Sequence, residues 1–127
     1  MKYKKAYICS PLSAKNEADI RVNMLQAQKF MWLVKKIISC QTVAPHAYLP
    51  YILNDNIPEE RNLGISFGKS LLELCDCLVI CTDTISNGMK AEIKLAKQND
   101  IDILKYKNNQ VVILSDSQID DFVKGGL

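Results

Sequence analysis

A chain of 127 residues, of which 48% are hydrophobic, is long enough for one α/β domain with a buried core and too short for two. Its 16 basic and 14 acidic residues nearly balance, which argues against a nucleic-acid groove or an anionic membrane as the main partner. No apolar run approaches the length of a bilayer span, and Met1 leads directly into a predicted strand rather than a signal peptide. We therefore expect a cytoplasmic protein with a single domain over residues 1–127.

The five cysteines stand at positions 9, 40, 75, 77 and 81. An odd number is unsuited to a secreted disulfide framework, so we expect the thiols to be reduced. Cys75 and Cys77 have the wrong spacing for the usual zinc knuckle, and the one histidine, His46, is distant in the sequence. We predict no metal site and no cofactor, and we interpret the cysteines as small buried apolar side chains.

The first part of the chain is predicted to form a strand at residues 6–9, which ends in a polar turn at 10–13. A long helix is predicted over 17–38, because apolar residues recur there at spacings of three and four. These core positions are Ile20, Met24, Ala27, Met31, Val34 and Ile38. Leu25 and Trp32, seven residues apart, project nearly the opposite way, so they either meet a partner chain or cover an adjacent loop.

A second strand is predicted at 42–44, followed by a shaped loop at 45–50 in which two prolines exclude a helix. The next helix begins at Pro58 and runs toward residue 74, and its Gly64 and Gly68 indicate close packing. A buried strand is then predicted between Asp76 and Thr82, and a helix that is capped by Ser86 or Asn87 and stops near Asn99 follows it. The last elements are strands at 101–106 and 111–114, joined by a turn at 107–110, and a helix at 117–124.

Strands that alternate with helices predict an α/β fold, namely a single flavodoxin/Rossmann-like domain with a mainly parallel five-stranded sheet flanked by helices. In such sheets the ligand lies beyond the carboxyl ends of the strands, where the strand order switches. The loops that should border this crevice are 9–13, Pro45 with His46, and 82–88.

Glu92 is the most informative residue of the predicted helix that follows Ser86. At about 100° per residue, it falls inside the apolar arc formed by Met89, Ile93 and Ala96. A carboxylate on a buried helix face is costly unless it is paired, hydrogen-bonded or lining a cavity, so it is a candidate site residue. The other interpretation is an ordinary ion pair or a position at the wet edge of the arc.

Asp76, Ser86, Gly88 and Glu92 stand in the pattern D-x9-S-x-G-x3-E between a strand and a helix. This pattern resembles the core of the nucleoside 2-deoxyribosyltransferase superfamily, which includes the deoxynucleoside 5′-monophosphate N-glycosidases and uncharacterised bacterial and phage relatives. The similarity covers about residues 6–106. Two further stretches carry it: Ala6-Tyr-Ile-Cys-Ser-Pro11 resembles the first strand and loop, and Ala44-Pro-His46 with Pro58-Glu-Glu-Arg61 resembles the uncharacterised branch.

The resemblance implies that Glu92 is a nucleophile that attacks C1′ of the sugar while the nucleobase leaves. It also implies that the Tyr7 hydroxyl holds this carboxylate and that Asp76 handles a proton or contacts the sugar. The order of the elements argues against this role for Asp76. Because Asp76 precedes its strand, it should lie at the opposite end of the sheet from Glu92, as an acidic residue of a turn.

The resemblance further implies a nucleoside or nucleotide ligand. A serine at position 86 favours a 5′-monophosphate, since a serine at a helix N-terminus can donate to a phosphate whereas a carboxylate would repel it. Arg21 or Lys15 would serve as the cation, although Pro11 removes one amide donor. For His46 the alternative is a structural contact. The expected substrate-binding residues are Cys9, Ser10, Pro11, Ser13, Pro45, His46, Ser86, Asn87, Gly88 and Met89.

Two other classes remain. One is a binding protein that keeps the crevice as a nucleotide sensor or sponge and turns nothing over. The other is a receiver domain with Asp83 as phosphoacceptor, but Cys9-Ser10-Pro11 supplies no acidic pair to hold Mg²⁺. The superfamily resemblance, together with Leu25 and Trp32, also predicts a homodimer or larger assembly with the helix at 17–38 in the contact.

Overall fold

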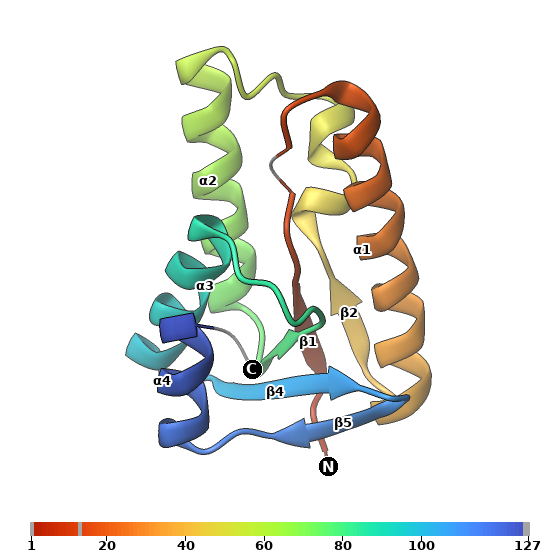
Figure 1. Cartoon of the computed structure of the whole chain (residues 1–127), viewed down its shortest axis with the longest axis vertical. Helices are drawn as coiled ribbons and strands as arrows, with labels where there is room; N and C mark the ends of the chain where they lie inside the picture. Colours follow the sequence, from red (N-terminus) through yellow and green to blue (C-terminus); the bar gives the residue numbers. More distant parts are fainter. Residues whose placement is uncertain (1, 13, 126–127) are drawn as a thin grey trace.

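Five strands form one sheet in the order β2-β1-β3-β4-β5 in the computed structural model, which describes residues 2–12 and 14–125 (Figure 1). The strands are β1 (Lys5–Cys9), β2 (Gln41–Val43), β3 (Cys77–Ile80), β4 (Asp102–Lys107) and β5 (Gln110–Ile113). The first four pair in parallel, whereas β5 pairs antiparallel to β4. The strand order therefore switches between β1 and β3, as in flavodoxin-like folds.

The helices cover the sheet unequally. Helix α1 (Glu17–Ile38) packs Ala27 and Val34 against one face, whereas α2 (Pro58–Glu73), α3 (Asn87–Gln98) and α4 (Asp116–Gly125) cover the other (Figure 1). Successive β1 side chains alternate between these faces, so Tyr7 and Cys9 point to the side of α2 and α3. One face of the sheet therefore lies under three helices, and their buried apolar side chains form one cluster with those of β1, β3 and β4.

Local chemistry explains where α1 and α3 begin. The Asn16 side chain accepts a hydrogen bond from the Asp19 amide at 2.8 Å, and Ser86 does the same for the Met89 amide at 3.2 Å. Helix α1 ends at Ile38, and its C-cap residue, Ser39, has a left-handed backbone with φ of 51°.

The predicted α/β architecture is confirmed, and the predicted helix at 17–38 has the bounds of α1. The exclusion of helical structure from residues 45–50 was wrong, because two short 3-10 helices occur there, η1 (Pro45–Ala47) and η2 (Leu49–Tyr51). Both carry proline in their first turn, where the backbone N–H that proline lacks has no helical partner to lose.

Large apolar side chains remain exposed on α1 and α2. Leu25 is 61% exposed and Trp32 is 59% exposed, so neither covers a loop within the described chain. Helix α2 buries only Leu72 and exposes Leu63 and Phe67. Its other face is close-packed as predicted, since a Cβ at Gly68 would lie 3.4 Å from the Tyr7 hydroxyl. None of the helices in the described residues is long and apolar enough to cross a membrane.

Candidate active site

Glu92 lies one and a half turns into α3 and points at β1. The Tyr7 hydroxyl donates a hydrogen bond to Glu92 Oε2 at 2.5 Å, and the Cys9 thiol approaches Oε1 at 3.6 Å. Tyr7 is 2% exposed and Cys9 is fully buried. Tyr7 and Cys9 on β1 thus meet Glu92, which is distant in the sequence, near the carboxyl end of β1 and beside the switch between β1 and β3.

The surroundings change the acidity of Glu92. Burial raises the pKa of Glu92 from its usual 4.5 to about 7, and the hydrogen bonds from Tyr7 and Cys9 offset part of that rise. Burial, reinforced by the neighbouring Glu92, raises the pKa of both the Tyr7 hydroxyl and the Cys9 thiol above their usual ranges. Near neutral pH, therefore, Tyr7 and Cys9 keep their protons and Glu92 changes charge.

Ser10 and His46 form a second buried pair next to Cys9. Ser10 Oγ and His46 Nε2 lie 2.8 Å apart, and both side chains are less than a tenth exposed. Burial lowers the pKa of His46 to about 4, so the imidazole is neutral at pH 7. The loops after β1 and β2 therefore meet through a neutral hydrogen bond.

The loop after β3 leads into the exposed amino-terminal turn of α3. Ser86 is partly buried, and Asn87 and Gly88 are exposed. Met89 is different, because it is 1% exposed and packs in the apolar core. Of the other predicted ligand contacts, Pro11 is partly buried and Pro45 is buried, whereas Lys15 and Arg21 are exposed. Ser13 lies outside the described residues.

Asp76 lies at the other end of the sheet. Its carboxylate accepts hydrogen bonds from the backbone amides of Lys4 at 2.8 Å and Lys5 at 3.0 Å, where β1 begins. Tyr7 and Cys9 meet Glu92 further along the same strand. The structure therefore does not bring Asp76 to Glu92, and its position is the one that bare topology predicts.

Lys105 on β4 is a buried charged residue that sequence reasoning missed. It is 5% exposed and donates to the loop that follows β3. A signal was present, because strand alternation puts Lys105 on the same face as Ile103, within a strand whose other central residues are apolar.

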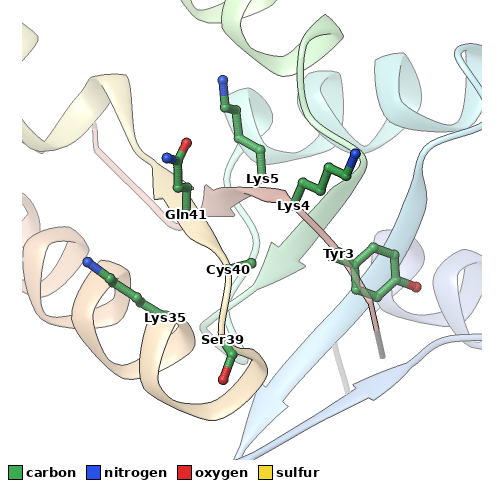
Figure 2. Close-up of a pocket in the computed structure, with 7 residues that line it drawn as sticks. All are labelled: Tyr3, Lys4, Lys5, Lys35, Ser39, Cys40 and Gln41. Carbon is green, nitrogen blue, oxygen red and sulfur yellow. The ribbon is translucent and has the colours of Figure 1, made fainter.

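Two surface cavities lie away from Glu92. One, of about 620 Å³, opens at the amino ends of β1 and β2, where the side chains of Lys4, Lys5 and Lys35 point in different directions (Figure 2). The other, of about 260 Å³, is an apolar groove between α1 and α2 beside β2. The described residues contain no group of three or more His, Cys, Asp or Glu side chains that could hold a metal ion.

The fold is similar to that of a solved 2-deoxyribosyltransferase from the psychrotolerant bacterium Bacillus psychrosaccharolyticus, with a TM-score of 0.61 and 11% sequence identity. The likeness covers 80% of this chain and 70% of that chain, and it shows a shared fold. Residues 4–106 match the family described as a domain of unknown function, DUF7768, and the chain belongs to this family. Among curated proteins no match is found.

Proposed function

We propose that this protein cleaves, or transfers at, the N-glycosidic bond of a (deoxy)nucleoside or nucleoside 5′-monophosphate, with Glu92 as the nucleophile. One observation carries the proposal: a partly desolvated carboxylate on the inner face of α3 is held by the Tyr7 hydroxyl at the switch point of the sheet. The similarity of the fold to a 2-deoxyribosyltransferase supports the reaction class.

In the proposed reaction a Glu92 oxygen attacks C1′ of the sugar, and the C1′–N bond breaks with its electron pair leaving on the base. Oε1 is the freer oxygen, since its contact to Cys9 is 3.6 Å whereas Oε2 accepts from Tyr7 at 2.5 Å. The transition state resembles an oxocarbenium ion, which an adjacent carboxylate stabilises. The glycosyl ester is then released to water or to a second base, and Glu92 regains its charge.

Phosphate would be bound at the amino terminus of α3. Asn87 and Gly88 are exposed residues, and their backbone amides and the Ser86 hydroxyl suit an anion there, with Arg21 or Lys15 as the proposed cation. Ser10, fixed by the neutral His46, would contribute a hydrogen bond without charge. The five free cysteines are consistent with action in a reducing compartment such as the cytoplasm.

A panel of nucleosides and 5′-monophosphates, with chromatography for free base, tests the proposal. Wild type should release base from at least one member, and Glu92→Gln should release none. Glu73→Gln, which alters an exposed glutamate on α2, is the matched control and should retain full activity. Equal release by wild type and Glu92→Gln would exclude Glu92 as the nucleophile.

The second candidate is a nucleotide-binding protein without turnover. It is favoured by the lack of a free acid at the site: within the described residues, the side chains that hydrogen-bond to Glu92 are Tyr7 and Cys9, and both already donate to its carboxylate. A departing base would have to take its proton from water. Calorimetric binding of a nucleotide that wild type leaves intact would favour this function over catalysis.

A further inference from the structure

Lys105 is a fully engaged buried cation. Its ammonium donates to the Thr82 carbonyl at 3.2 Å, to Asp83 Oδ1 at 3.1 Å and to the Tyr106 carbonyl at 3.3 Å. A lysine has three donors, so these contacts use all of them. Because desolvating an ammonium costs free energy, an apolar residue at this position would stabilise the fold more if packing were its only role.

The hydrogen bonds of Lys105 join two segments. Lys105 is aligned with Ile80, the last residue of β3, while Thr82 and Asp83 belong to the loop that leaves β3. The ammonium thus ties this loop to the neighbouring strand β4. The loop has a second anchor, because the Cys81 amide donates to the Cys9 carbonyl on β1 at 3.0 Å.

Contacts of Thr82 lead from this loop to Met89 on the helix that carries Glu92. The Thr82 hydroxyl donates to the Thr84 carbonyl at 2.9 Å and approaches Met89 Sδ at 3.9 Å. Met89 is buried in the first turn of α3, three residues before Glu92 and therefore on the same side of the helix. The loop after β3 is therefore joined to the first turn of α3 both by the chain and by the contact of Thr82 with Met89.

We propose that Lys105 is a positioning residue for Glu92: by fixing the loop after β3, it holds the start of α3 so that the Glu92 carboxylate reaches Tyr7 and is kept from water. Lys105 acts through the loop and touches no reacting atom. The effect on turnover rests on the proposed function, whereas the effect on the Glu92 environment does not.

Carbon-13 NMR of the Glu92 side-chain carboxyl tests the geometry directly. The described titratable groups within reach of this carboxyl are Tyr7 and Cys9, which stay protonated near pH 7. In Lys105→Met, a looser loop should admit water, and the titration midpoint should fall toward that of an ordinary glutamate, by on the order of one pH unit. Loss of a cation by itself would raise the midpoint. The direction therefore separates positioning from simple charge, and an unchanged or raised midpoint overturns the proposal.

Lys107→Met is the matched control, since that side chain is 57% exposed and lies 4.0 Å from the same Asp83 oxygen. It should leave the midpoint unchanged. Should Lys105→Met fail to fold, Thr82→Val changes no charge and removes the hydroxyl that donates to the Thr84 carbonyl and approaches Met89 Sδ. That variant should show a smaller fall in the same direction, and no fall would overturn the proposal.

If wild type releases base, Lys105→Met should lower kcat at least tenfold and leave KM within about twofold, because Lys105 does not contact the substrate. A rise in KM at constant kcat would contradict positioning. If no variant releases base, the proposed function fails, and the NMR result still decides the role of Lys105.

Discussion

Replacing Glu92 with glutamine should make the folded protein more stable at alkaline pH. The pKa of Glu92 is about 7 in the folded chain and near its usual 4.5 in the unfolded chain. The folded state therefore holds a proton that the unfolded state loses between these values. Stability from the protonated acid is present below about pH 4.5 and is lost as the pH rises through 7.

The magnitude follows from the size of that rise in pKa. At about 1.4 kcal/mol per pH unit, a rise from 4.5 to about 7 corresponds to roughly 3 kcal/mol of stability lost by pH 8. Glutamine has nearly the same shape and no charge, and its amide oxygen can still accept from Tyr7. Glu92→Gln should thus be up to roughly 3 kcal/mol more stable than wild type at pH 8 and nearly equal at pH 4.5.

Urea denaturation at pH 4.5 and pH 8 measures this difference. Glu73→Gln, at an exposed position of α2, is the control and should match wild type at both values. A Glu92→Gln protein that is no more stable than wild type at pH 8 would contradict the argument that Glu92 is a desolvated acid.

Three other predictions concern the tyrosine, the aspartate and the exposed helix face. Tyr7→Phe removes a hydrogen bond that favours the ionised form, so the pKa of Glu92 should rise by about one unit in a carboxyl NMR titration; a fall would contradict the assigned contact. Asp76→Ala should lower the free energy of unfolding by about 1–3 kcal/mol in urea, because two backbone amides lose their acceptor, and it should leave that pKa unchanged. A change in the pKa of Glu92 in this variant would instead indicate that Asp76 belongs to the site. Wild type should sediment as a homodimer or larger species, and the double variant Leu25→Glu, Trp32→Glu should dissociate, since both side chains are more than half exposed. A monomeric wild type would refute assembly, and an unchanged oligomer in the variant would move the contact elsewhere, for instance to the exposed apolar residues of α2.

The parts of the fold with local periodicity were predictable from the sequence. The apolar stripe of α1 predicted its bounds, and the wheel of α3 placed Glu92 on the inner side, because both depend on residues a few positions apart. The site beside β1 followed from the alternation of strands and helices. The hydrogen-bond partners of Glu92 were harder to predict: Tyr7 was assigned by resemblance, and Cys9 was expected to contact the ligand.

Contacts that depend on strand register and on long-range packing were not predictable. Lys105 reaches Asp83 across 22 positions of sequence, and a pattern of residue types does not show that β4 aligns it with the end of β3. The same limit applies to the Ser10–His46 pair, which joins two loops of irregular backbone. Resemblance also assigned Asp76 to the site, whereas its order relative to β3 indicated the opposite end of the sheet.

The most direct test of the central claim is to look for a sugar bound covalently to Glu92. Wild type would be mixed with each nucleoside and 5′-monophosphate of the panel, quenched in acid within milliseconds to seconds, digested and analysed by mass spectrometry. A retaining mechanism predicts a glycosyl mass increase on the peptide that contains Glu92, formed together with free base and missing in Glu92→Gln. Free base that accumulates in both proteins, or a glycosyl group on another residue, would contradict the assignment of Glu92 as the nucleophile.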